Sequence, residues 1–445
     1  MILRYGRVEG RQNESSAVPR ISWTVRVQEA SAPLKVRPYR LHFFARMLSW
    51  TGSSVSTIGL AFAVLHIQGG AGALGLVLAA GMLPQILLLL VGGVVADRWS
   101  RAKVMLWANM VSFAAEGAAA ALLWAGAAKV WHLAAMAAVC GAASAFFTPA
   151  AGGVVVEVVP AEIRHAANAL LKLGQNTVKV GGPAVGGVLV ALVGPAWVIG
   201  WDALTFAAAA VLCSRIGLNA ARVKVRAGFV ADLRDGWTDF WSRRWLWVMV
   251  LQGAVIVPAW LVGYQALGPV YGERFLGGSG LWGVVVSGFT GGLIAGAAAT
   301  LVWKPRLAVV VVCAGTGTMA LPLAAMALRL PVPVLVVTAF IAGAGLAFSG
   351  TSWASVVQAR IPADRMSRTM SYSTLGQLIP VPVGYMLVGP LVALFGLRAT
   401  LAAEALLIVC AAVAPLAMAQ VRELSATVPE EAAETALASA ARAPR

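Results

Sequence analysis

Few side chains in this 445-residue chain could do chemistry, and one of them is a carboxylate inside an apolar run. Glu116 lies near the middle of the run 104–126, and Asn109 and Ser112 share its helical face. A carboxyl group removed from water favours its protonated form, so it can take up and release protons near neutral pH. Glu116 is therefore our candidate for proton coupling. A structural glutamate held by hydrogen bonds is the alternative.

Two further rows of polar side chains follow apolar runs at helical spacing. They are Arg46, Ser49, Ser53 and Ser56 in the run 41–66, and Lys172, Gln175, Asn176 and Lys179 in the run 167–193. Residues three or four apart lie on one face of a helix, and polar groups are costly in lipid. Both rows are therefore expected to line a substrate cavity. Two lysines there would favour an anionic substrate or a buried acid, unless Lys172 extends to the membrane surface instead.

The run 245–270 supplies the remaining cavity candidates, Gln252, Trp260 and Tyr264. Trp260 and Tyr264 are four residues apart, so their rings share a face and could stack against a large, flat substrate. An aromatic belt at the membrane surface is the alternative, because this segment nears the outer side of its predicted span.

Asp202 and Glu404 lie at the outer ends of the runs 197–216 and 399–420, where we expect each to cap a helix or to pair at the surface. The four cysteines and four histidines are scattered without metal or redox spacing, so no metal site is expected. No spaced set of nucleophile and base supports an enzyme, and we expect no catalytic residues. What remains is the chemistry of binding a solute.

The elements that must position these side chains are long apolar segments. Apolar residues make up 60% of the chain and charged residues 12%, against about 25% charged in an ordinary soluble domain. About 20 apolar residues cross a bilayer as a helix. Such runs lie near 41–66, 73–95, 104–126, 131–153, 167–193, 197–216, 245–270, 280–303, 307–328, 332–354, 369–394 and 399–420. The sequence thus predicts an all-α integral membrane protein with twelve transmembrane helices.

The distribution of Lys and Arg predicts the orientation of these helices. If the N-terminus is inside, 27 of the 34 Lys and Arg residues fall on the inner side, four on the outer side and three within spans. Positive charge gathers on the cytoplasmic side of membrane proteins, so both termini are expected in the cytoplasm. The net charge of +16 then reflects topology, and no nucleic-acid partner is expected.

A shift of 202 residues places the second half of the chain in register with the first. Leu173-Gly174-Gln175 meets Leu375-Gly376-Gln377, and the stretch Gly187–Gly194 meets Gly389–Gly396. Parallel repeats of six helices are a transporter architecture, with the substrate between the halves near the midplane. The predicted domains are a basic N-terminal tail at 1–38, six-helix bundles at 39–216 and 245–420, a cytoplasmic linker at 217–244 and a C-terminal tail at 421–445.

The linker at 217–244 combines basic residues with a helical apolar pattern. The apolar positions, among six Lys and Arg residues, are Phe229, Leu233, Trp237, Phe240 and Trp241. This pattern predicts a short amphipathic helix on the cytoplasmic membrane surface, with its basic residues facing anionic lipid headgroups. A loose linker is the alternative.

The segment 93–103 carries a charged motif at a helix boundary. Its residues are Gly93, Asp97, Arg98, Arg101 and Lys103. A carboxylate there can lie against the positive end of a neighbouring helix and pair with Arg, a latch that rocking of the two halves would break and remake. The segment resembles the loop signature of the major facilitator superfamily, although Ser100 replaces the usual glycine and Ala102 a common basic residue.

A second motif lies in the run 167–193. It consists of Gly182, Pro183, Gly186 and Gly187. It resembles the end of the antiporter motif of that superfamily, which is typical of exporters, although Val178 and Ala169 stand where earlier glycines are usual. Glycines let helices approach closely, and proline leaves a backbone acceptor free for bending. A plain packing seam between helices is the alternative.

Three further stretches narrow the family. Ala145–Ala150, Asp202–Phe206 and Asp235–Phe240 resemble the group that contains the enterobactin exporter and the macrolide-efflux proteins. This resemblance covers about residues 39–420 and implies two six-helix bundles that export a drug, siderophore or other metabolite by proton-driven alternating access. It also implies an inner-membrane protein, which we expect to be a monomer, with a small-molecule substrate, protons and lipids as partners and no cofactor beyond the proton gradient. An importer or facilitator of the same fold is the runner-up, and a membrane receptor or enzyme is the alternative from another class.

Overall fold

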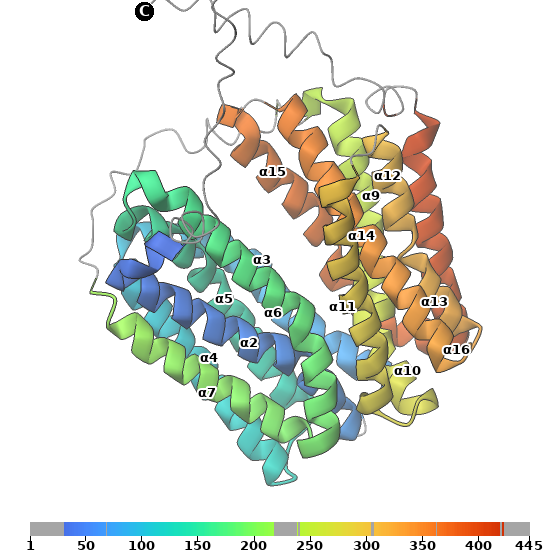
Figure 1. Cartoon of the computed structure of the whole chain (residues 1–445). Coiled ribbons are helices and arrows are strands. Elements are labelled where there is room, and N and C mark those ends of the chain that lie inside the picture. Colours follow the sequence, from blue (N-terminus) through green and yellow to red (C-terminus); the bar gives the residue numbers. More distant parts are fainter. Residues whose placement is uncertain are drawn as a thin grey trace, which may run out of the picture.

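A computed structural model describes residues 31–67, 69–217, 238, 241–303, 307–361, 363–418 and 421 of the chain. These residues form helices and their connections, and no strand occurs among them (Figure 1). The predicted amphipathic linker helix and most of both predicted tails lie outside the described residues.

Six long helices form the N-terminal half, in the order that the apolar runs predict. They are α2 (Arg37–His66), α3 (Ala71–Arg98), α4 (Arg101–Trp124), α5 (Val130–Val158), α6 (Arg164–Val193) and α7 (Pro195–Ser214), with 3₁₀ turns at Ala32–Lys35 and Ala161–Ile163. Each helix contains a segment long and apolar enough to cross a membrane. Short connections join them, so consecutive helices run in opposite directions.

The C-terminal half repeats this arrangement with more interruptions. Its elements are α9 (Arg244–Trp260), the π-helical turn η3 (Leu261–Ala266), α10 (Leu267–Phe275), α11 (Ser279–Val302), α12 (Ala308–Gly317), α13 (Ala320–Ala327), α14 (Val332–Arg360), α15 (Ala363–Leu378), α16 (Val381–Val413) and a 3₁₀ turn at Ala414–Ala417. α9, η3 and α10 together form one apolar span, and α12 and α13 form another. Pro258 near the end of α9 lacks a backbone donor, which favours the change of hydrogen-bond pattern that follows it.

The last apolar segment, Tyr372–Ala417, crosses the membrane twice. Its 46 residues would measure about 69 Å as one helix, more than twice the hydrocarbon core of a bilayer. Gly396 breaks it with φ 78° and ψ 160°, and Gly194, 202 positions earlier, ends α6 with φ 84° and ψ 162°. Only glycine adopts such a conformation without strain, so both repeats turn the chain at the same glycine. Eleven described segments are long and apolar enough to span, and the division of the last one confirms the predicted twelve crossings.

The two bundles touch at one end and diverge toward the end at which α15 begins (Figure 1). Where they meet, α6 lies against α11 and α3 lies against α16. A Cβ atom on Gly187 would lie 2.6 Å from the Cα atom of Gly283, and one on Gly72 would lie 3.0 Å from the Cα atom of its neighbour Gly389. Gly187 and Gly389 are equivalent positions of the repeat. Two backbone-to-backbone contacts, here called the glycine contacts, therefore join the bundles at this end.

Small residues also bring helices together inside each bundle. Gly141 of α5 lies against the carbonyl oxygen of Gly81 in α3, and Gly343 of α14 lies against the carbonyl oxygen of Phe289 in α11. The α3–α5 and α11–α14 pairs hold equivalent places in the two halves. A larger side chain at either glycine would force its helix pair apart, because packed interiors leave no spare volume.

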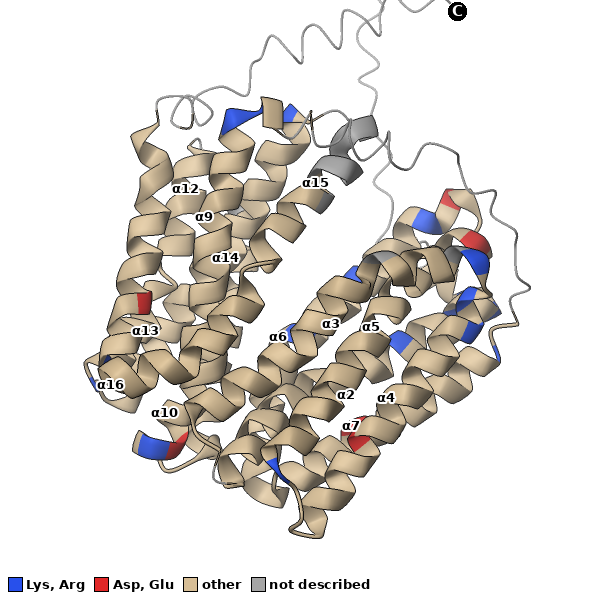
Figure 2. Ribbon diagram, turned by 180° about the vertical axis from the view of Figure 1, so that it is seen from behind, with Lys and Arg blue, Asp and Glu red and all other residues tan. Residues whose placement is uncertain are grey.

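Charged residues lie mostly at the ends of the bundles (Figure 2). Lys and Arg gather mainly at the end where the bundles diverge (Figure 2). The count of basic residues predicts this distribution for the cytoplasmic side of a membrane protein. The side of the membrane that this end faces stays a prediction.

Candidate functional site

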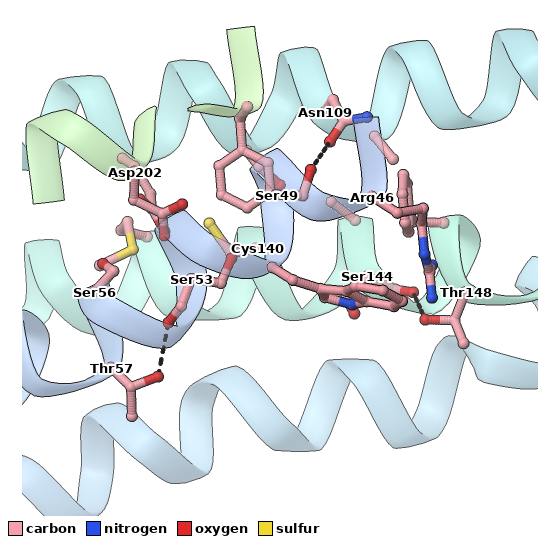
Figure 3. Close-up of a pocket in the computed structure, with 18 of the residues that line it drawn as sticks. Arg46, Ser49, Ser53, Ser56, Thr57, Asn109, Cys140, Ser144, Thr148 and Asp202 are labelled. Atoms are coloured by element: carbon pink, nitrogen blue, oxygen red, sulfur yellow. Dashed lines mark hydrogen bonds between the residues drawn. The ribbon is translucent and has the colours of Figure 1, made fainter. Parts of the chain in front are cut away.

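A polar cavity of about 390 Å³ lies inside the N-terminal bundle (Figure 3). The helices that line it are α2, α4, α5, α6 and α7. Its polar lining is Arg46, Ser49, Ser53, Ser56, Thr57, Asn109, Ser112, Glu116, Ser144, Thr148, Gln175 and Asp202, and its larger apolar side chains are Trp50, Leu60, Met136, Cys140, Phe147 and Phe206. The polar rows of α2 and α4 thus meet across one space. α5 and α7 add side chains that the predicted rows do not include.

Two carboxyl groups, those of Glu116 and Asp202, form one end of the cavity. Glu116 is 7% exposed and Asp202 is fully buried. The two groups lie within hydrogen-bonding reach of each other, while Glu116 Oε2 and Asp202 Oδ2 receive no donor from the residues that the structure describes. Two carboxyl groups can share a hydrogen bond only if one of them carries a proton. This end of the cavity can therefore hold a proton.

The position of Asp202 corrects the expectation that it caps a helix or pairs at the surface. Asp202 lies two turns inside α7, where that helix packs against α2 and α4. A Cβ atom on Gly52 of α2 would collide with Asp202 Oδ1. Thr205 Oγ1 donates to Asp202 Oδ1 at 3.1 Å, and the side chains of Ser53 and Ser56 lie near the same carboxyl group. Asp202 is thus a buried member of the site.

A hydrogen-bonded bridge between α2 and α4 crosses the middle of the cavity. Ser49 Oγ donates to Asn109 Oδ1 at 3.1 Å (Figure 3). Asn109 Nδ2 donates to Met105 O at 2.9 Å and to Cys213 Sγ of α7 at 3.7 Å. Ser112 lines the cavity between this bridge and the two carboxyl groups. The polar face predicted for α4 therefore runs along the cavity wall.

The other end of the cavity holds the cation of Arg46. Its guanidinium carbon lies 4.2 Å from the centroid of the Trp50 ring and 5.3 Å from that of the Phe147 ring. Within the described part of the protein, Arg46 Nε finds no hydrogen-bond acceptor. Cation–π contacts therefore hold a positive charge that can still bind a ligand.

A second hollow, of about 570 Å³, continues from Arg46 toward the start of α6. It shares Arg46, Trp50, Thr148 and Gln175 with the first cavity and adds His42, His165, Asn168 and Lys172. His42 is fully buried, and neither of its ring nitrogens has a hydrogen-bond partner among the described residues. One polar route thus follows α2 from His42 past Arg46 to the carboxyl groups.

The predicted cavity residues of α6 divide into two sets. Gln175 lines both hollows, and Lys172 lines the second. Asn176 and Lys179 are exposed and line neither. Because α6 packs against both α2 and α11, only part of its polar face reaches the N-terminal cavity.

The cavity candidates of the C-terminal bundle lie in its packed core. Trp260 and Tyr264 stack on each other, with ring centroids 4.3 Å and planes 10° apart, and both are buried. This arrangement leaves neither ring free to stack on a substrate or to form a surface belt. Gln252 is buried and donates to Cys313 Sγ at 3.7 Å and to a carbonyl group of α16 at 3.4 Å. Glu404 is also buried, so the expectation that it pairs at the surface is wrong.

The fold has counterparts among known proteins. The family model described as Major Facilitator Superfamily matches residues 43–384, most of the chain. This protein belongs to the Major Facilitator Superfamily. The match confirms the family that the sequence motifs resemble, and with the twelve crossings it confirms the predicted fold.

Known transporters resemble most of the chain. The multidrug efflux pump Tap of Mycobacterium tuberculosis is 26% identical over 403 residues, which cover 87% of this chain and 94% of Tap. The crystal structure of the nucleoside transporter NupG matches with a TM-score of 0.66 at 14% identity, covering 86% of this chain and 98% of NupG. The crystal structure of a bacterial homolog of the human lysosomal transporter Spinster, in an inward-facing and occupied conformation, matches with a TM-score of 0.66 at 15% identity. The match covers 89% of this chain and 99% of the homolog. The solved structures show a shared fold.

The charged motif of this superfamily member lies where α3 ends and α4 begins. Gly93, Asp97 and Arg98 belong to the end of α3, and Arg101 and Lys103 to the start of α4. The Arg101 guanidinium lies against Gly153 of α5, where a Cβ atom would collide with it. The Asp97 side chain lies outside the described ones, so the latch stays a prediction.

The antiporter-like glycines place α6 against two other helices. Gly182 lies against the Ser54 side chain of α2, and a Cβ atom on Gly186 would lie 2.7 Å from Val55 O of α2. Gly187 makes one of the glycine contacts with α11. The motif therefore packs helices together, as the alternative interpretation of the sequence predicts.

Carbonyl groups before Pro183 accept hydrogen bonds from both of these neighbours. Ser54 Oγ of α2 donates to Val178 O at 3.1 Å. Thr290 Oγ1 of α11 donates to Val180 O at 2.6 Å. Side chains from both bundles thus bond to the carbonyl groups on either side of Lys179, whose own carbonyl loses its helical donor to Pro183.

Proposed function

We propose that this superfamily member exports hydrophobic small molecules, drugs or metabolites, by proton-coupled alternating access. The N-terminal cavity carries the proposal, because two buried carboxyl groups lie at one end of it and a cation between aromatic rings lies at the other. Similarity to the multidrug efflux pump Tap supports outward transport of drug-like cargo. We infer that it lies in the cytoplasmic membrane with both termini in the cytoplasm, from the positions of its basic residues.

Contact between the bundles at one end supports alternating access. The glycine contacts close that end, and rocking of the bundles would open it while the other end closes. In the predicted orientation the closed end faces outward. The polar route from His42 then leads to the cytoplasmic side, where an exporter loads its cargo.

The cavity lining favours an amphiphilic cargo. Its volume lies within the range of small-molecule sites, about 300–1,000 Å³. Aromatic and aliphatic side chains supply contact area, and hydroxyl and amide groups supply hydrogen bonds. A siderophore-like cargo is the second candidate, because the guanidinium group of Arg46 lines the cavity and would bind an anionic oxygen.

Transport by the purified protein in liposomes tests the proposal. The probes are ethidium, a hydrophobic cation with a permanent charge, and fluorescein, an anion. With an acidic interior, we expect ethidium to accumulate inside against its own gradient while protons leave, and an ionophore that collapses the pH gradient should stop this accumulation. Liposomes without protein are the control.

Two outcomes would contradict this proposal. Probe movement that follows only the probe gradient would indicate a facilitator. Accumulation on the alkaline side would indicate movement with protons, as in an importer. Accumulation of fluorescein in place of ethidium would favour the siderophore-like cargo.

A further inference from the structure

We propose that Glu116 and Asp202 form a single proton site, and that its charge controls the Gly187–Gly283 contact through one turn of α2. This rests on the proposed function, because it names where the coupled proton is held and what its loss moves. The site lies among α2, α4 and α7 of the N-terminal bundle, and the contact joins that bundle to α11 of the other.

One oxygen of each carboxyl group is buried behind the end wall of the cavity. Glu116 Oε2 and Asp202 Oδ2 each expose less than 1 Å² and find no donor among the described residues. Buried polar oxygens without a partner are rare in proteins, and one shared proton would give the pair its missing hydrogen bond. A cargo molecule does not reach these atoms in this conformation, so a proton is the ligand that fits.

Few titratable or charged groups surround the pair. α5 contributes the thiol of Cys140, and α2 contributes the hydroxyl groups of Ser53 and Ser56. Arg46 lies on the same face of α2, about two turns away, and α6 adds the uncharged Gln175. No cation contacts the pair within the described residues. Loss of the shared proton therefore leaves two negative charges side by side, which repel each other.

One turn of α2 connects the pair to α6. Gly52 touches the pair, because a Cβ atom there would collide with Asp202 Oδ1. The following residues, Ser54 and Val55, touch the glycine motif of α6, and Gly187 of that motif touches α11. These contacts contain no long side chain that could absorb a shift. A displacement of α2 at Gly52 is therefore passed to the contact between the bundles.

The direction of the effect follows from the charge. With one proton shared, the carboxyl groups bond to each other and α2 stays packed on them. Without it, repulsion is relieved when α2 withdraws and water enters, and that withdrawal loosens α6 from α11. In the predicted orientation, proton release to the cytoplasm then precedes opening to the outside, as an exporter that exchanges cargo for protons requires.

Electron paramagnetic resonance distances across the contact test this inference without any cargo. Spin labels replace Leu192 of α6 and Leu281 of α11, both exposed, in a chain whose four cysteines are substituted. At acidic pH we expect a short distance between the two labels, which corresponds to the closed contact. As the pH rises, a growing population should show a longer distance, which corresponds to the open contact. The double variant Glu116→Gln/Asp202→Asn should keep the short distance at every pH.

Two further variants serve as matched controls. Glu404→Gln changes the buried acid at the equivalent position of the second repeat and should keep the pH response. Gly187→Leu separates the contact by its size and should give the long distance at every pH, even in the double variant. If the double variant does not fold, either single carboxamide replaces it, since an amide donates to the remaining carboxylate without repulsion.

The inference is wrong if the label distance in the double variant grows with rising pH as it does in the parent. It is also wrong if the label distance in Glu404→Gln stays short at every pH. The transport assay separates this from the proposed function. If the distance responds to pH but no probe accumulates, export is wrong and the proton site stands. If ethidium accumulates while the double variant still opens, export stands and the proton site is wrong.

Discussion

The two bundles share a backbone plan, and the N-terminal bundle encloses a polar cavity. Gly194 and Gly396 turn the chain in the same left-handed conformation. Gly187 and Gly389 each meet a glycine of the opposite bundle. The repeat therefore preserves how the chain turns and how the halves touch, which are the features that alternating access needs from both halves.

The acids at equivalent positions show where the bundles differ. Asp202 lies beside Glu116 at the end of a cavity, whereas Glu404 is buried with no second carboxyl group beside it among the described residues. In the C-terminal bundle, a stack of Trp260 and Tyr264 fills the core, and further rings pack around it with centroids within 5.5 Å. The same scaffold thus holds a pair of buried carboxyl groups in one half and a core of packed rings in the other.

Larger side chains at the glycine contacts should reduce transport more than any other change, and the reduction should be equal in the two repeats. Gly187→Leu and Gly389→Leu each place a side chain where backbones now touch, so the contact cannot close. We expect each to reduce proton-driven ethidium accumulation in liposomes to the level without protein. Gly181→Leu of α6 adds its side chain in open space and should keep transport. Loss of transport in one repeat alone would contradict the equivalence of the contacts.

Replacing a buried acid by its amide should affect proton-driven transport in the N-terminal repeat and leave it unchanged in the C-terminal repeat. Glu116→Gln should lower proton-driven ethidium accumulation about tenfold or more, which corresponds to ~1.4 kcal/mol of lost coupling. Exchange of ethidium without a pH gradient should persist, because exchange needs no net proton transfer. Glu404→Gln should keep both activities and the pH dependence of the parent. Loss of coupling in Glu404→Gln would remove the distinction between the halves.

The positions of the spans are predictable from the sequence because length and apolarity are local properties of a run. The run 41–66 falls within α2, the run 104–126 ends two residues after α4, and the polar rows on both line the cavity. The turn at Gly396 lies inside a continuous apolar helix, and it is recognised through the repeat with Gly194. Most of the fold can therefore be predicted from patterns within single helices and from the repeat.

Contacts between helices are not local, and helical spacing within one run does not predict them. Helical spacing groups Asn176 and Lys179 with Gln175, but it does not say that α6 is shared between two neighbours. Spacing also puts Trp260 and Tyr264 on one face, where the rings meet each other instead of a substrate. The buried position of Asp202 is predictable from the sequence, because a helix that starts after Gly194 places this residue about 10 Å from the start of the helix.

A pair of adjacent glycines in α5 tests whether the charged motif of the first half needs its packing. A Cβ atom on Gly153 would collide with the Arg101 guanidinium, whereas one on Gly152 would meet open space. Gly153→Ala should therefore displace Arg101 and lower ethidium transport a few-fold, measured as the initial rate. Gly152→Ala should transport at the parent rate. Equal rates in the two variants would show that the position of Arg101 does not matter for transport.

Substitution of two buried amides that make similar hydrogen bonds should have the smallest effect on transport and stability. Asn109 and Gln252 each donate to a cysteine Sγ at 3.7 Å, one in each bundle. Gln252→Leu exchanges long hydrogen bonds, worth about 1 kcal/mol, for apolar burial of similar size, so the unfolding midpoint in detergent should change by only about 2–4 °C. Its ethidium transport should stay at the parent rate.

Asn109→Leu, by contrast, takes the acceptor from Ser49 and puts an apolar side chain into the cavity, so transport should fall a few-fold while the midpoint changes little. The ratio of the two transport rates is thus the measurement that matters. An equal loss in both variants would mean that the C-terminal amide contributes to cargo binding as well. The cavity would then extend across both bundles, and the division of labour between a chemical half and a rigid half would be wrong.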